Sequence, residues 1–115
     1  MKGPRRVGRH FRPQPVTIDG HRFDSKSEGR RYGTLRRLCE AGLVRNLEVH
    51  PQLPLIVNGK KIGRGFITLD FKYEEFTDGK WRLIYEDHKP IITRAAKTRI
   101  EVAEAANGVT IRLSK

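Results

Sequence analysis

Three charged residues in the centre of the sequence have types and a spacing that could do chemistry. Residues 65–90 read GFITLDFKYEEFTDGKWRLIYEDHKP, two β-type segments joined by a turn at positions 78–79. Alternate residues of a strand share a face, so Asp87 and Lys89 project together, and a hairpin would place Asp70 beside Asp87. Two adjacent carboxylates repel each other unless a cation or a proton lies between them. The three side chains together indicate magnesium-dependent hydrolysis of phosphodiester bonds.

The same residues also fit a purely structural interpretation. An acidic residue in a short strand commonly faces solvent, and Asp87 with Lys89 could form a surface ion pair that contributes little to stability. Since 32% of the residues are charged, an Asp-x-Lys triplet alone has low specificity. The chemical interpretation therefore depends on other parts of the chain.

A helix from Asp24 to about Gly42 is expected to carry a third candidate acid. Ser25 is an N-cap type, and apolar residues follow at helical spacing, namely Tyr32, Leu35, Cys39 and Leu43. Glu28 continues this apolar stripe, and an inward carboxylate needs a partner. Ser25-x-x-Glu28 also fits a capping box, so both interpretations stay open. Gly29 is a poor helix former, which indicates a close approach of another segment.

Turn signals and periodicity predict the other elements. They are a hairpin over 16–23, a strand within 46–59 ending at an Asn-Gly turn, a strand over 60–73, a strand over 81–89, a helix over 93–108 and a final strand over 109–113. His50 precedes a proline and is interpreted as a surface residue, with a place near a site as the alternative. A small mixed sheet flanked by helices is expected.

The composition restricts the class of protein. A chain of 115 residues forms one small domain with room for one site. Its 24 Lys and Arg against 13 Asp and Glu give a net charge of +11, which attracts polyanions, nucleic acid before an anionic membrane surface. No apolar run is long enough to span a membrane and no signal segment follows the start. With Cys39 as the single cysteine, disulfides within the chain and cysteine-rich zinc sites are excluded, and a cytoplasmic protein is expected.

Basic residues outside the centre are candidates for DNA contacts. Residues 1–15 contain several arginines, three prolines and no acid, and predict a disordered basic arm, before a folded domain over 16–115. A merely solubilising tail is the alternative. In the helix over 93–108, Lys97 is expected to contact phosphate, because backbone amides also point outward in its first turns. A solvated helix face is the alternative for Lys97. The candidate contacts are Arg5, Arg6, Arg9, Arg12, Lys26, Arg30 and Lys97.

The order of these elements resembles the PD-(D/E)XK nuclease superfamily. Helix, three strands, helix and strand follow one another, with Glu28 on the first helix, Asp70 on the second core strand and Asp87-x-Lys89 on the third. The runs DG-x-x-FDSKSE, NGKKIG, DFKY and EDHK are similar to a family of small phage-encoded, Holliday-junction-resolvase-like endonucleases, over about residues 18–113. Three positions depart from the pattern, namely Leu69 for proline, His88 for an apolar residue and Pro90 for glycine.

The resemblance implies an α/β, restriction-endonuclease-like αβββαβ core and a site. Glu28, Asp70, Asp87 and Lys89 would be catalytic, and Mg²⁺ would be held by the three acids and the backbone carbonyl of His88, with Mn²⁺ able to substitute. The expected function is a metal-dependent endonuclease acting on branched DNA, a Holliday junction resolvase of phage origin. A homodimer is expected because a four-way junction needs two symmetric nicks. The alternatives are a general or nicking DNA endonuclease and a non-enzymatic nucleic-acid-binding module.

Overall fold

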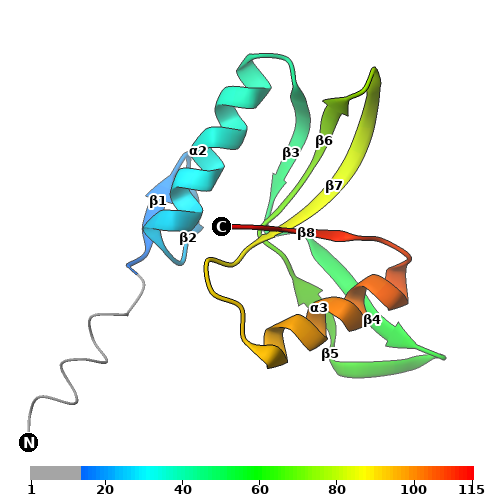
Figure 1. Cartoon of the computed structure of the whole chain (residues 1–115). Coiled ribbons are helices and arrows are strands. Elements are labelled where there is room, and N and C mark those ends of the chain that lie inside the picture. Colours follow the sequence, from blue (N-terminus) through cyan, green and yellow to red (C-terminus); the bar gives the residue numbers. More distant parts are fainter. Residues whose placement is uncertain (1–13) are drawn as a thin grey trace, which may run out of the picture. The chain divides into compact units, whose positions relative to one another are not determined.

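The computed structural model describes residues 14–115, and its helices and strands carry the labels of Figure 1. Four predicted DNA contacts, Arg5, Arg6, Arg9 and Arg12, and most of the predicted basic arm lie outside the described residues. The chain divides into two compact units, the first ending at Thr34 and the second spanning Leu35–Lys115. Each unit is described by itself.

The first unit begins with the hairpin that the sequence predicts. Strands β1 (Val16–Ile18) and β2 (His21–Phe23) are antiparallel, with Val16 opposite Phe23. The two turn residues, Asp19 and Gly20, have φ angles of 53° and 79°. Left-handed conformations at both turn positions match the twist of the flanking strands, which is why Asp-Gly favours this turn.

Helix α2 (Lys26–Glu40) begins in the first unit, where Gly29 allows a close approach to β1. A Cβ atom at Gly29 would lie 2.7 Å from Val16 Cγ2 and 3.1 Å from Ile18 Cδ1. The Phe23 and Tyr32 rings are both buried, with centroids 5.1 Å apart. The close approach predicted from the poor helix former in the first turns is confirmed.

Helix α2 ends in the second unit one turn earlier than the apolar stripe. Gly42 has a φ of 79°, its N–H donates to Cys39 O at 3.0 Å, and the N–H of Leu43 donates to Leu38 O at 3.0 Å. These are the two bonds of a glycine-terminated Schellman motif. Leu43, predicted to continue the stripe, is therefore beyond the helix and 46% exposed.

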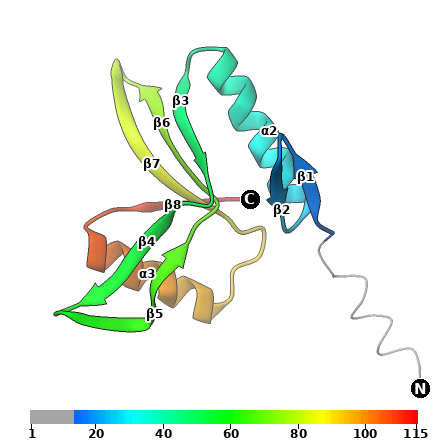
Figure 2. The same ribbon diagram turned by 180° about the vertical axis from the view of Figure 1, so that it is seen from behind.

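The second unit contains a mixed four-stranded sheet, a separate two-stranded ribbon and a second helix (Figures 1 and 2). The sheet has the order β3-β6-β7-β8, and its strands are β3 (Val44–Val49), β6 (Phe71–Thr77), β7 (Lys80–His88) and β8 (Ile111–Ser114). The strand β8 is parallel to β7, whereas the other pairs are antiparallel. The ribbon consists of β4 (Gln52–Val57) and β5 (Lys60–Thr68), and the helix is α3 (Arg94–Asn107).

The strand predicted over residues 60–73 is wrong in one respect, because it is two strands in different sheets. The chain leaves β5 and enters β6 at Leu69 and Asp70. There the N–H of Leu69 donates to Pro51 O at 2.8 Å, and Asp70 O accepts from the N–H of His50 at 2.9 Å. With β3 also separate from β4, five strands lie between α2 and α3 within residues 14–115, in place of the three predicted.

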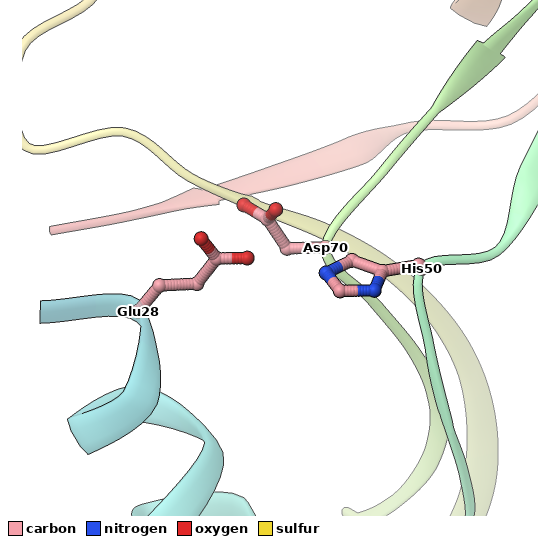
Figure 3. Close-up of side chains that lie close together, drawn as sticks. All are labelled: Glu28, His50 and Asp70. Carbon is pink, nitrogen blue, oxygen red and sulfur yellow. The ribbon is translucent and has the colours of Figure 1, made fainter. Parts of the chain in front are cut away.

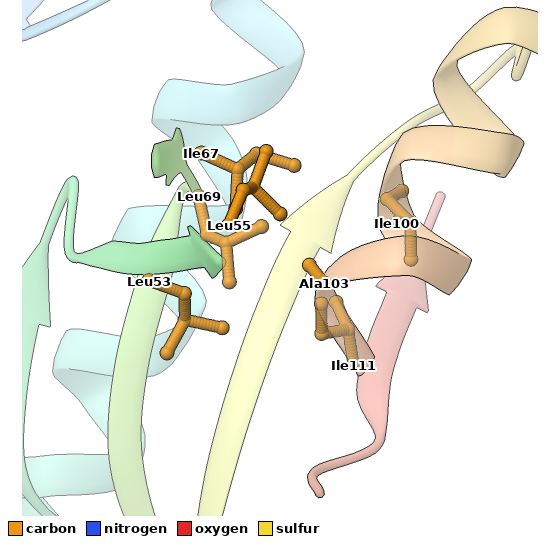
Figure 4. Close-up of a cluster of buried hydrophobic side chains, with 7 residues drawn as sticks. All are labelled: Leu53, Leu55, Ile67, Leu69, Ile100, Ala103 and Ile111. Carbon is orange, nitrogen blue, oxygen red and sulfur yellow. The ribbon is translucent and has the colours of Figure 1, made fainter. Parts of the chain in front are cut away.

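The core of the second unit lies between the ribbon, α3 and β8 (Figure 4). Its buried side chains are Leu53, Leu55, Ile67, Leu69, Ile100, Ala103 and Ile111. Each fully buried aliphatic side chain of this kind contributes about 1.5–3 kcal/mol of transfer free energy. The predicted second helix is confirmed. Thr93 Oγ1 accepts from the N–H of Ala96 at 3.1 Å, and Gly108 ends the helix in a left-handed conformation.

Candidate functional site

Asp70 is positioned by the crossing between the two sheets. It directly precedes β6, and the pairing of Phe71 with Glu86 continues to bring Asp70 opposite Asp87. Asp70 Oδ2 accepts a hydrogen bond from the backbone N–H of His88 at 2.6 Å. The carboxylate is thus held at the end of β7, where the sequence placed it.

Asp87 and Lys89 share one side of β7, as strand alternation predicts. The Asp87 side chain is 6% exposed, and Lys89 Nζ lies 3.1 Å from Asp87 Oδ2. The backbone N–H of Lys89 donates to Ser114 O of β8 at 2.8 Å. The pair is therefore a buried acid with a half-exposed lysine, anchored by the parallel strand.

Burial and a second carboxylate make the ionised form of Asp87 unfavourable. Loss of solvent is the largest cause, followed by the adjacent Asp70 carboxylate, and together they raise the pKa of Asp87 to about 6 although Lys89 acts in the opposite direction. Such a shift is typical of carboxyl pairs that share a proton or a cation. The acids predicted to lie side by side are brought together.

A small cavity opens beside these residues and involves α3. Its volume is about 80 Å³, and it is lined by Ile67, Thr68, Asp87, Lys89, Ala96, Arg99 and Ile100. Arg99 was not selected as a candidate from the sequence. No local signal selected it, because its place in the cavity depends on how α3 packs. Lys97, which was selected, is exposed and is not among the lining residues.

His50 lies next to Asp70 (Figure 3), so the alternative given for it from the sequence describes its position. A ring nitrogen of His50 and a carboxylate oxygen of Asp70 lie within 4.8 Å of each other. His50 has a φ of 60° at the corner between β3 and β4, and it is exposed. Imidazole and carboxylate groups at this separation could hold a metal ion, without selecting one metal.

Glu28 lies in the first turn of α2 (Figure 3). Its N–H donates to Ser25 Oγ at 3.2 Å, and its Oε1 accepts from the N–H of Asp24 at 3.3 Å. These two bonds form a variant of the capping box, in which the glutamate reaches the residue before the serine. The capping interpretation of this buried side chain is supported, and its role toward a metal stays a prediction.

A buried polar network lies on the opposite face of β7 and fixes His88. Glu86 is 0% exposed and accepts hydrogen bonds from Tyr73 Oη and from Ser114 Oγ, the latter at 2.7 Å. Ser114 Oγ also lies 2.9 Å from His88 Nδ1. Because the amide of His88 binds Asp70, this network positions the acid through the strand. Whether the His88 carbonyl serves a metal stays a prediction.

The remaining predicted DNA contacts in the described residues are surface cations. Lys26 and Arg30 are exposed on α2, and Lys97 is exposed on α3. Lys26 and Arg30 line a shallow depression together with Gly29 and the side chains of β1. Exposure makes these three available to a polyanion.

Comparison with known proteins gives a family. No curated protein and no solved structure matches the chain. Among residues 14–115, no helix has the length and apolar character needed to cross a bilayer. Residues 9–106 match the family described as "Protein of unknown function (DUF1064)", and the chain belongs to that family.

Proposed function

We propose that this protein is a metal-dependent endonuclease of the PD-(D/E)XK type that hydrolyses phosphodiester bonds in branched DNA, as a phage Holliday junction resolvase. The observation that carries this is the grouping of Asp70, Asp87 and Lys89, with Lys89 Nζ 3.1 Å from a buried Asp87 oxygen. A solvated surface ion pair would have neither the burial nor the second acid. The net charge of +11 supports a polyanionic substrate.

The donor set fits a divalent cation with oxygen ligands. Burial, and after it the adjacent Asp70 carboxylate, raise the pKa of Asp87 to about 6. A cation between the two carboxylates would relieve their repulsion. Oxygen ligands suit Mg²⁺ and also accept Mn²⁺. From the sequence resemblance, Glu28 and the carbonyl of His88 complete the proposed ligands. When bound, the metal would polarise the phosphate and lower the pKa of a water molecule.

The side chains around the acids have separate tasks in this proposal. Lys89 is a compact cation that would orient the attacking water or stabilise the extra negative charge of the transition state. Asp70 needs a fixed orientation, which its hydrogen bond from the His88 amide supplies. Arg99 lines the same cavity and would bind a phosphate oxygen.

The test is cleavage of a labelled four-way junction and of the matching linear duplex, each with Mg²⁺ or EDTA. We expect paired nicks in the junction alone, dependent on metal and reduced at least about 100-fold in Lys89→Ala, because a group that stabilises transition-state charge is lost. Lys80→Ala, an exposed lysine at the start of β7, is the control and should cut normally. Cleavage of both substrates would indicate a general endonuclease, and binding without cleavage would indicate a binding module.

The same assay separates the two interpretations of Glu28. In Glu28→Gln the amide oxygen can still accept from the N–H of Asp24, whereas the charge is removed. If Glu28 is a metal ligand, cleavage falls while the melting temperature stays close to that of the wild type. Unchanged cleavage would leave Glu28 as a helix cap alone.

The proposed compartment is the cytoplasm of a bacterial host. DNA as the proposed substrate supports this location. The single Cys39 is also suited to a reducing compartment. Fractionation of cells producing the tagged protein would test the location, and recovery outside the cytoplasmic fraction would contradict it.

A further inference from the structure

The ribbon formed by β4 and β5 has charge of one sign. Its charged residues over Gln52–Thr68 are Lys60, Lys61 and Arg64, all three exposed. The hairpin of β6 and β7 is different, because it contains both cations and acids; the acids are Glu74, Glu75, Asp78, Glu86 and Asp87. A surface with cations and no acid attracts phosphate without competition from its own carboxylates.

The shape of this ribbon also suits a duplex. Within the described residues β4 and β5 pair only with each other, and they reach away from the four-stranded sheet (Figures 1 and 2). Asn58 and Gly59, with φ angles of 51° and 77°, form a tight turn, and Lys60 and Lys61 follow it directly. A two-stranded ribbon with an unpaired outer edge is an element that fits a groove of DNA.

A groove connects the ribbon to the candidate site. Its volume is about 480 Å³, and it is lined by Leu55, Ile62, Gly63, Arg64, Thr98, Arg99 and Val102. Arg99 also lines the cavity that contains Asp87 and Lys89. Lys89 and Arg99 line the cavity, and Arg99 and Arg64 line the groove. The three cations therefore form a series from the site toward the ribbon.

On the basis of the nuclease function above, we propose that the ribbon and the first half of α3 bind the sugar–phosphate backbone of the duplex arm that leads to the cleaved bond. Lys60 and Lys61 contact phosphates at the tip of the ribbon. Arg64 and Arg99 contact the phosphates nearer the site. Contacts of this kind fix position on the duplex and carry no base sequence.

The apolar residues of the ribbon suggest a different partner for this surface. Ile56, Val57 and Ile62 are 44%, 40% and 39% exposed, and such a surface could also bind a protein. We favour DNA over a protein as the partner, because the same surface carries three cations and no acid. A protein partner becomes the outcome if the cations prove irrelevant to DNA binding.

The test is fluorescence anisotropy of a labelled duplex in EDTA, measured over a series of salt concentrations. Lys60→Gln/Lys61→Gln is compared with Lys80→Gln/Arg82→Gln, which removes the same charge from the other hairpin, after the same kind of tight turn. We expect weaker binding by the ribbon variant alone. The slope of log affinity against log salt should fall by about 0.9 for each phosphate that the variant no longer neutralises. Melting temperatures close to that of the wild type show that both variants are folded.

The outcomes separate this inference from the proposed function. Equal affinities and slopes for the two variants, with a wild type that binds and cuts the junction, would overturn the ribbon surface alone. A wild type that neither binds nor cuts DNA would overturn both. Selective weakening in the ribbon variant supports the surface, and Arg64→Gln should then lower the salt slope by the amount expected for about one phosphate.

Discussion

Asp87 is the residue whose ionised form both burial and a neighbouring carboxylate disfavour. Its carboxyl group is removed from water and faces Asp70, and only Lys89 favours its ionised form. In the proposed function, a metal ion would supply the charge that Lys89 does not fully provide. The property that destabilises the metal-free site is thus the one that would bind the metal.

We predict a pH-dependent stability that belongs to Asp87. Its folded pKa of about 6 lies above the value of about 3.9 for an unfolded chain. The stabilising contribution of protonated Asp87 to the free energy of unfolding is therefore fully present below about pH 4. As the pH rises through about 6 it is lost, and the free energy of unfolding falls by up to about 3 kcal/mol. About half of this loss falls between pH 5 and pH 8. Chemical denaturation in EDTA at these two pH values should show it in the wild type and not in Asp87→Asn.

Two comparisons make this prediction specific. Asp78→Asn, at an exposed turn position, should keep the pH dependence of the wild type. Mg²⁺ at pH 8 should raise the midpoint of the wild type and leave that of Asp87→Asn unchanged. An identical pH dependence in wild type and Asp87→Asn would contradict the shifted pKa.

At the scale of residues, the sequence predicted the positions of those side chains that follow from the alternation of residues along a strand. The shared side of Asp87 and Lys89 follows from alternation, and the Asp70 partner follows from the turn between the strands. His50 and Arg99 could not be assigned in the same way, because their positions depend on the corner between β3 and β4 and on how α3 packs. Both are tertiary features without a local signal strong enough to select one residue.

At the scale of elements, Gly29 makes the contact between α2 and β1 possible. In Gly29→Ala the gain in helix propensity of about 1 kcal/mol is opposed by a methyl group 2.7 Å from Val16 Cγ2. Overpacking of this kind costs about 1–3 kcal/mol, so we expect a net loss of about 1 kcal/mol in the free energy of unfolding. Denaturation by urea measures it.

A compensating variant tests the cause of that loss. In Gly29→Ala/Val16→Ala the clash is removed, so the double variant should be more stable than the sum of the two single changes predicts. Strict additivity would show that the side chain of Val16 is not the obstacle. If the Gly29→Ala protein were more stable than the wild type, β1 would be able to move away from the new methyl group at little cost.

The elements were predicted well where turns define them and poorly where a strand changes sheets. Asn-Gly and Asp-Gly turns marked the hairpins correctly. The break at residues 69–70 was missed because Ile67, Leu69, Phe71 and Tyr73, all buried, keep an uninterrupted alternation through it. Only the hydrogen bonds to His50 and Pro51 reveal that the strand ends there.

At the scale of the whole molecule, the proposed reaction requires two copies. One group of Asp70, Asp87 and Lys89 per chain can make one nick, and a four-way junction needs two symmetric nicks. We therefore expect sedimentation equilibrium to give a dimer, alone or on junction DNA. A monomer under both conditions would contradict a resolvase and would favour a nicking enzyme.

The parallel strand β8 has a consequence for the order in which the candidate site is assembled. Lys89 is held by a backbone hydrogen bond from its amide to Ser114, and Ser114 Oγ also contacts Glu86 and His88. During synthesis the acids and the lysine leave the ribosome before the strand that anchors them. A nascent chain thus carries these groups without their final support, and the proposed hydrolytic activity would require that β8 has already paired with β7.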